Sequence, residues 1–425
     1  MSAFPRSLAI AAALLLGLPA RAEPLTPDAA VALALRRNRD VIAARLDLQA
    51  VEIERLTARL YPNPILSYTA SNLVLGGGNP QGAGVRPSFF DQTVHTIGLS
   101  EIIDIWAKRS ARIRAADRGI DHQRLLLADA LREIAYAVRA TFAEVLREQS
   151  EHALAKDTQT RYEDTLRLTR ARRAAGDISE TELKKVELEG LRYQNALIDA
   201  DLQLDLARQK LAALLALPST AALPEPLAED TFAREEGSVE ALVRQALAAR
   251  PDVRAVEAAK RRAQAMIALQ RREALPDVSL GLSYTHSGFT VSGDNPNSLA
   301  LSLQLPLPIF DRNQGNIARA HLDALRAEND AARMELLVRH EVSDAARRAA
   351  RSRALVDAYE GGMLDRAETA LRVAEKSYRA GAVSLLELLE AQRTYLEIHG
   401  AYLRIMHDYR QANIDVAHAV GSEGS

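Results

Sequence analysis

Long stretches of this sequence place an apolar residue at every seventh position. A seven-residue period is typical of long helices that wind around one another in a left-handed supercoil. The pattern predicts helices over 25–60, 107–175, 179–216, 239–272, from the end of 306–315 to about 380, and 384–420. The residues that carry the seven-residue period are Ile113, Ile120, Leu127 and Ile134, then Ile317, Ala324, Ala331, Val338 and Ala345, and finally Leu389, Leu396 and Leu403.

Four shorter stretches alternate apolar and polar residues instead, which predicts strands. In the clearest of them, Leu280, Leu282 and Tyr284 alternate with small polar residues. The predicted strands cover residues of about 65–75, 93–103, 277–288 and 297–306.

These elements follow one another in the same order twice: helix, strand, strand, long helix, turn, helix. A repeat of this size determines the fold before any motif does. We expect a first repeat over 23–217, a linker rich in proline and acidic residues over 218–237, and a second repeat over 238–421. The fold class is mainly α with a small β part. Each long helix measures roughly 100 Å at about 1.5 Å per residue.

Each long helix ends in a short turn of similar sequence. Gly176 and Gly381 stop the helices, because glycine tolerates the left-handed conformation at a helix C-terminus. Ser179 starts the next helix of the first repeat, with Glu182 completing a capping box, and Ser384 and Glu387 are the matching pair in the second repeat. The two turns are therefore predicted to be the tips of sharp helical hairpins.

Composition excludes several classes of protein. The chain has 425 residues and a formal net charge of −2, which gives no sign of nucleic-acid binding. It has no cysteine, which excludes disulfides, thiolate metal sites, a cysteine nucleophile and the acylated cysteine of a lipoprotein.

The first residues have the features of a cleaved secretory signal peptide over 1–22. Arg6 supplies a positive charge, Leu8 to Leu18 an apolar run, and Ala20-Arg-Ala22 a cleavage site between small residues. The alternative is a membrane anchor, but the apolar run is shorter than the roughly 20 residues that span a bilayer. We therefore expect an exported, non-lipidated protein without a helical anchor.

The strands of the second repeat present one apolar and one polar face, which is the pattern of an outer-membrane barrel. Four strands cannot close a barrel alone, and unpaired strand edges are intolerable in lipid. Pooling the strands of three chains would give twelve, an even number found in known barrels. A soluble hairpin packed on helices is the alternative that this pattern leaves open.

The order and spacing of these features resemble the TolC-type outer-membrane efflux family over nearly all of the predicted mature chain. The segments that carry the resemblance are 25–35, 104–109, 306–315 and, most strongly, 378–392, Tyr-Arg-Ala-Gly-Ala-Val-Ser-Leu-Leu-Glu-Leu-Leu-Glu-Ala-Gln. The Pro-Leu-Pro-Ile-Phe-Asp-Arg-Asn-Gln-Gly phrase of 306–315 is most similar to the heavy-metal cation-efflux branch.

The resemblance implies a homotrimeric channel-tunnel, with a shared twelve-stranded barrel in outer-membrane lipid and an α-helical barrel crossing the periplasm. It implies two partners, a periplasmic adaptor and an inner-membrane RND transporter. The chain would be a passive exit duct, with heavy-metal cations as the first expectation for its cargo. Exit of drugs or of type I secreted proteins is the alternative cargo.

The resemblance also implies site residues. Glu387 and Glu390 match the acidic constriction of the family, and Tyr378 and Glu182 match a closing link of some members. Val383 stands where the family has an arginine, which predicts a more loosely held gate. The adaptor is expected to contact both tips, at Gly176, Asp177, Gly381 and Ala382.

Other interpretations remain open for these residues. Glu387 and Glu390, three apart, share one helix face and could be ordinary solvated charge, as could Glu182. The histidines show no ligand spacing, so no metal site is predicted, and the Gly-rich segment 76–84 lacks the lysine of a phosphate-binding loop. We expect no catalysis and no cofactor. A periplasmic coiled-coil structural protein and a periplasmic binding protein or enzyme are the competing functions.

Overall fold

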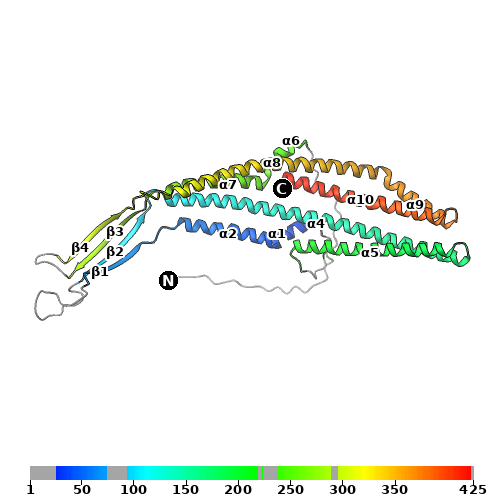
Figure 1. The fold of residues 1–425 in the computed structure, drawn as a ribbon, viewed down its shortest axis with the longest axis horizontal. Helices are drawn as coiled ribbons and strands as arrows, with labels where there is room; N and C mark the ends of the chain where they lie inside the picture. The colour runs from blue at the N-terminus through cyan, green and yellow to red at the C-terminus, as the bar shows by residue number, and fades with distance from the viewer. Residues whose placement is uncertain (1–24, 74–92, 219–222, 224–236, 289–294, 423–425) are drawn as a thin grey trace. The chain divides into compact units, whose positions relative to one another are not determined.

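The computed structural model describes residues 25–73, 93–218, 223, 237–288 and 295–422. The predicted signal peptide, the Gly-rich segment 76–84 and most of the linker 218–237 lie outside these residues. The described chain is mainly helical with a small sheet, as predicted. Its helices (Figure 1) are α1 Pro27–Arg37, α2 Arg39–Arg59, α4 Lys108–Ala175, α5 Glu180–Leu214, α6 Val239–Ala249, α7 Pro251–Glu273, α8 Gln314–Ala358, η1 Tyr359–Met363, α9 Leu364–Arg379 and α10 Leu385–Val420.

The seven-residue period identified helix faces that pack. None of the twelve residues that carry it is exposed, and Ile120, Val338 and Ala345 are buried. The prediction of an unbroken helix between the first pair of strands and the first tip is confirmed, because α4 runs through 68 residues.

Two predicted helices are broken, and those predictions were wrong. The helix predicted over 25–60 divides into α1 and α2 at Asn38, whose ψ of 135° is extended. The helix predicted over 239–272 divides into α6 and α7 at Arg250, which has a ψ of 127°. Arg250 precedes Pro251, and the proline ring disfavours helical backbone at the residue before it.

The second long helix is also interrupted, where the sequence predicts continuity to about residue 380. Between α8 and α9, the π-helical turn η1 contains Gly361 with ψ of 17° and Gly362 with φ of 116°. A positive φ of this size is accessible to glycine and strained for other residues. The adjacent glycines therefore permit a kink that the apolar period does not reveal.

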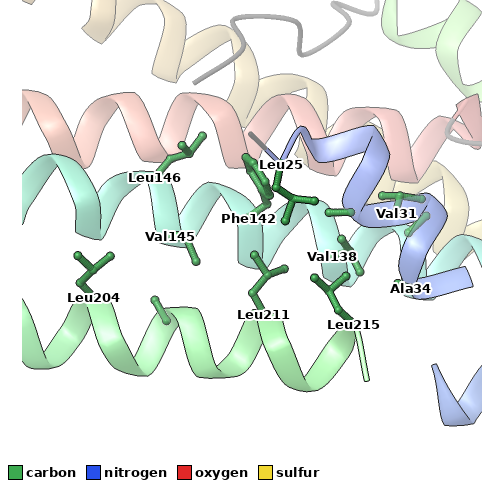
Figure 2. Close-up of a cluster of buried hydrophobic side chains, with 13 residues drawn as sticks. Leu25, Val31, Ala34, Val138, Phe142, Val145, Leu146, Leu204, Leu211 and Leu215 are labelled. Atoms are coloured by element: carbon green, nitrogen blue, oxygen red, sulfur yellow. The ribbon is translucent and has the colours of Figure 1, made fainter. Parts of the chain in front are cut away.

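The chain divides into two units, and each is described by itself. The first unit comprises residues 1–39, 133–236 and 344–418, and the second comprises 40–132, 237–343 and 419–425. In the first unit, α1, α4 and α5 enclose a core (Figure 2). The side chains labelled in Figure 2 are Leu25, Val31, Ala34, Val138, Phe142, Val145, Leu146, Leu204, Leu211 and Leu215.

The second unit contains an antiparallel four-stranded sheet in the order β1-β2-β3-β4. The central pair joins a strand of the first repeat to a strand of the second, with Leu99 opposite Leu282. The strands are β1 Ile65–Ser71, β2 Val94–Ile103, β3 Val278–Ser287 and β4 Asn297–Gln304.

Two strands end earlier than the sequence predicts. Strand β1 stops before residue 75 because Asn72 adopts a φ of 62°. Strand β4 stops before residue 306, since Pro306 has no N–H for a ladder.

The two faces of the sheet differ sharply. One row across all four strands consists of leucines, and each of these side chains is at least half exposed. Its members are Leu66, Leu99, Leu282 and Leu301, with exposed fractions of 71%, 54%, 51% and 75%. The neighbouring row on the opposite face consists of small residues, Ser67, Gly98, Ser283 and Ala300. Figure 1 shows β1 and β4 as the outer strands of this sheet.

Each repeat ties the break between its first two helices to the end of its last helix. In the first repeat, Asn38 Nδ2 donates to the Leu214 carbonyl at 3.0 Å. In the second, Arg250 donates to the Ala419 carbonyl at 3.2 Å and also pairs with Asp252 and Glu341. Carbonyls in the last turn of a helix have no partner in the helix itself, so both contacts satisfy otherwise orphaned acceptors.

Candidate functional site

The two predicted tips are sharp helical hairpins in the first unit, where α4 turns into α5 and α9 turns into α10 (Figure 1). Gly176 has a φ of 87° and Gly381 a φ of 73°, so both are left-handed as the sequence predicts. Asp177 N donates to the Arg172 carbonyl at 2.9 Å, and Ala382 N donates to the Ser377 carbonyl at 2.8 Å. This 6→1 hydrogen bond defines the Schellman ending of a helix.

The helices that leave the tips begin differently. Ser179 and Glu182 form the complete capping box, in which Glu182 N donates to Ser179 Oγ and the Glu182 carboxylate accepts from Ser179 N at 3.0 Å. At the second tip, Glu387 N donates to Ser384 Oγ at 3.3 Å. The returning bond to the Glu387 carboxylate is absent from the hydrogen bonds of the described chain. The predicted box is therefore complete only at the first tip.

A cluster of buried side chains joins the two hairpins. Tyr162 of α4 and Val186 of α5 lie in it together with residues of α9 and α10, and Leu388 is only 1% exposed. The buried members are Tyr162, Val186, Leu371, Tyr378, Leu385, Leu388 and Tyr395. Leu385 and Leu388 flank the exposed Glu387, so the acidic side chain projects from a helix whose opposite face is fixed.

Tyr378 is buried between the hairpins, with 3% of its surface exposed. Its hydroxyl lies 3.2 Å from Thr169 Oγ1, and its backbone carbonyl accepts from Arg172 at 3.3 Å. The Arg172 guanidinium also lies over the Tyr378 ring, 5.1 Å from its centroid. Sequence reasoning missed both partners. Thr165, Thr169 and Arg172 continue the helical spacing after Tyr162, but polar residues at these positions look like a solvated face.

The structure places the predicted gate residues in two environments. Glu387 and Glu390 are exposed and form no ion pair within the described part of the chain. Glu182 is partly buried, and its carboxylate accepts from Ser179. Within one chain the Tyr378 hydroxyl lies 3.2 Å from Thr169 Oγ1, and no hydrogen bond joins Tyr378 to Glu182 among the described residues. The predicted link between them stays a prediction.

The Val383 side chain can make no polar link at the second tip, but an arginine of the first hairpin reaches that tip. Val383 is partly buried and packs against the cluster below the tips. Arg172, from the first hairpin, reaches the second through the carbonyl and ring of Tyr378. Val383 stands where the resemblance led us to expect an arginine, and Arg172 of the first hairpin contacts the second hairpin. The predicted adaptor-contacting residues Gly176, Asp177, Gly381 and Ala382 are all exposed.

Two histidines farther from the tips, His399 and His407, are partly buried. Burial lowers the pKa of His399 and of His407 below the ordinary value, and Arg147 lowers that of His407 further. Over the residues that the structure describes, no group of three or more His, Cys, Asp or Glu side chains could hold a metal ion. None of the described helices has both the length and the apolar character needed to cross a membrane.

Comparison with known sequences shows what these features belong to. The pattern that defines the outer membrane efflux proteins matches residues 30–217 and 242–422. The chain belongs to the outer membrane efflux protein family. Members of this family are channels of the outer membrane and not enzymes, which confirms both the resemblance and the expectation that the chain catalyses nothing.

Relatives of this chain are named for different substances. The cobalt-zinc-cadmium resistance protein CzcC of Cupriavidus metallidurans is 28% identical, over 94% of this chain and 91% of CzcC. The nickel and cobalt resistance protein CnrC of the same species is 26% identical, over 72% and 71% of the two chains. The pyoverdine export outer membrane protein OpmQ of Pseudomonas putida is 26% identical, over 93% of this chain and 85% of OpmQ.

Solved structures share the fold. The structure of CusC, described in terms of folding and transmembrane channel formation, has a TM-score of 0.75 and 18% identity, over 93% of this chain and 92% of CusC. The outer membrane protein VceC of Vibrio cholerae has a TM-score of 0.72 and 18% identity, over 93% of this chain and 96% of VceC. At these identities the likeness establishes a common fold alone.

Proposed function

We propose that this chain is the outer-membrane exit duct of a tripartite efflux system. The observation that carries the proposal is the two-faced sheet. A row of exposed leucines covers one face, a row of serine, glycine and alanine covers the other, and β1 and β4 leave two edges to pair. In lipid, the backbone groups of an outer strand must pair with another strand, because no water is available to them. The four strands of one chain therefore require further copies of the chain. Three chains would supply a twelve-stranded barrel.

The barrel suggests roles for the helices, the tips and the acidic residues of the second tip. The long helices would line a passage through the periplasm, and the tips would face an adaptor and an inner-membrane RND transporter. In the trimer, Glu387 and Glu390 would ring the axis, where clustered carboxylates attract cations. Heavy-metal cations are the cargo we propose, supported by the similarity to CzcC and CnrC. The similarity to OpmQ makes a pyoverdine-like siderophore the second candidate. Export would use the predicted signal peptide without lipidation.

Fractionation tests the assembly. We expect the full-length protein in outer membranes, extracted by mild detergent as a trimer that heat dissociates on a denaturing gel. Release as a soluble monomer after osmotic shock would overturn the proposal and favour a periplasmic coiled-coil protein.

A charge-removal variant tests the gate separately. Glu387→Ala combined with Glu390→Ala should weaken block by divalent cations and lower cation selectivity in planar bilayers. Glu328→Ala, which removes an exposed carboxylate from α8, is the matched control and should leave both unchanged. Unaltered block and selectivity in the double variant would show that these carboxylates do not line the passage.

A further inference from the structure

The loop between β4 and α8 displays large apolar side chains that no part of the described chain covers. Leu307 is 70% exposed, Ile309 59% and Phe310 89%. Phe310 is the most exposed of the large hydrophobic side chains that the structure describes. It lies in the Pro-Leu-Pro-Ile-Phe-Asp-Arg-Asn-Gln-Gly segment, a motif for which the proposed duct alone gives no physical role.

The loop is rigidly built, so the exposure of Phe310 is not that of a loose segment. Asn313 donates through Nδ2 to the backbone carbonyl of Gln270 on α7 at 2.8 Å and to the Gln270 side chain at 2.9 Å. Asn313 has a φ of 59°, a conformation that asparagine tolerates better than most residues. Gln314 donates to the Phe310 carbonyl at 3.2 Å and accepts from Arg312 N at 2.7 Å. The polar side chains thus fix the backbone that presents Phe310.

The same end of the sheet carries two other aromatic side chains. Tyr61 precedes β1 and is 62% exposed, with the Arg109 guanidinium 4.2 Å from its ring centroid. Trp106 follows β2, and its indole N–H donates to the Pro276 carbonyl at 2.9 Å. In an antiparallel sheet, the start of β1 and the ends of β2 and β4 lie at the same end of the sheet. Tyr61, Trp106 and Phe310 therefore lie at the end of the sheet from which the helices continue.

The opposite end of the exposed apolar face carries tyrosines. Tyr68 lies opposite Ile97 and Ile97 opposite Tyr284, one row beyond the leucine row. Aromatic residues make up only 4% of the chain, so their presence at both ends of the apolar face is informative. Aromatic side chains at the two limits of an apolar band are characteristic of membrane–water interfaces.

We propose that the loop 305–313 is a membrane anchor, in which Phe310, Ile309 and Leu307 enter the boundary between headgroups and acyl chains. The partner is a phospholipid bilayer, on the leaflet next to the helices. Continuity with the exposed leucine face argues for lipid. Trp106 adjoins the central strand β2, and Tyr61 and Phe310 adjoin the edge strands β1 and β4, whereas a contact with another copy would concentrate at the edges. This inference rests on the proposed insertion of the sheet.

Site-directed spin labelling tests the anchor directly, because the chain has no native cysteine. Three single-cysteine variants of the full-length protein, Phe310→Cys, Leu301→Cys and Leu336→Cys, would be labelled in vesicles of phosphatidylethanolamine and phosphatidylglycerol. Leu301 reports on the apolar face of the sheet, and Leu336, 61% exposed on α8, is the apolar control away from the sheet. Collisions with oxygen report lipid, and collisions with an aqueous nickel complex report water.

We expect the labels at 310 and 301 to collide more with oxygen than with nickel, and the label at 336 to show no such excess. A water-accessible label at 310 beside a lipid-exposed label at 301 would overturn the anchor alone. A label at 310 shielded from both reagents would also overturn it, as a protein contact. A water-accessible label at 301 would overturn the proposed insertion itself. Ile309→Cys provides the same readout should Phe310→Cys fail to fold.

Discussion

The two repeats share one backbone plan and differ in how rigidly each is held. In the first repeat, α4 is unbroken and the first tip has a complete capping box. In the second repeat, the long helix is interrupted at η1, and the tip has only one of the two hydrogen bonds of a capping box, from Glu387 N to Ser384 Oγ. The comparison teaches that the apolar period specifies where helices pack, while single glycines and caps decide whether they can bend.

The interruption is bridged by a small set of side chains. Tyr402 of α10 donates to the Glu360 carboxylate at 2.9 Å, and its ring stacks with that of Tyr359 at 6.5 Å between centroids. These contacts hold α10 against the turn at which Gly362 departs from helical geometry. The second repeat is therefore the more deformable one at this turn, with a specific contact that limits the deformation.

The largest expected difference between the repeats concerns the residues at the helix breaks. Arg250 is 3% exposed, and this burial alone would lower its pKa. The hydrogen bonds and negative charges of Asp252 and Glu341 together outweigh burial and raise the pKa of Arg250. Arg250→Ala removes one partner from a buried ion pair and should lower the free energy of unfolding by about 3–5 kcal/mol. Asn38→Ala should cost about 1–3 kcal/mol, since the partly buried Leu214 carbonyl loses its donor. Chemical unfolding followed by circular dichroism measures both, and equal losses would contradict the distinction.

The interruption itself gives the next largest effect. Gly362→Ala places a Cβ at a φ of 116° and should lower the free energy of unfolding by about 1–2 kcal/mol. Gly361→Ala is the matched control, because its φ of −66° suits alanine and no atom lies within 4 Å of the added Cβ. Thermal unfolding of both variants measures the difference. A neutral Gly362→Ala would show that the kink is not required.

The contact between the hairpins is expected to contribute less. Tyr378→Phe removes the hydroxyl that lies 3.2 Å from Thr169 and should cost about 1 kcal/mol. Thr169→Val removes this contact and also the hydrogen bond that Thr169 Oγ1 donates to the Thr165 carbonyl at 2.8 Å, so it should cost more. The double variant should cost little more than Thr169→Val alone, because Tyr378→Phe removes only a hydrogen bond that Thr169→Val has already broken. A double-mutant cycle measures this coupling. Fully additive losses would contradict the contact.

The difference between the caps is smaller still. Ser179→Ala removes the N-cap of a complete capping box and should cost about 1 kcal/mol, whereas Ser384→Ala should cost less. Hydrogen exchange of the first-turn amides of α5 and α10 compares the two. Equal acceleration of exchange would show that the completed box adds nothing.

The pH dependence gives the smallest expected effect. Burial, then Arg147, lower the pKa of His407 below its ordinary 6.5, and a hydrogen bond with the Ala143 backbone, Asp408 and Glu144 oppose this shift. Below about pH 6.5 the unfolded chain takes up a proton that the folded chain does not, so stability falls as the pH falls. His407→Gln should flatten this slope, while the exposed His340→Gln should not. Melting temperatures measured from pH 7.5 to pH 5.5 test it, and identical slopes would contradict the assignment.

The sequence predicts the main architecture because it depends on periodic patterns. Seven-residue and two-residue periods located the long helices and the four strands, and the glycine stops located both tips. It could not predict the break at Asn38, since no proline follows it and its interruption depends on a hydrogen bond to the distant Leu214. The sequence also could not predict the partners of Tyr378, because they lie far from it along the chain. Thr169 is a polar residue and suggests a solvated position, yet it is fully buried in the fold.

Conductance tests the central claim, that the chain is a passive duct, most directly. Purified full-length protein would be reconstituted in planar lipid bilayers, and single-channel currents would be recorded without any pump or energy source. The account predicts discrete, ohmic conductance steps that divalent cations block from the side of the tips. Protein that inserts, as judged by a lipid-exposed label at Leu301, yet conducts no ions in either the parent chain or the Glu387→Ala, Glu390→Ala variant would contradict it.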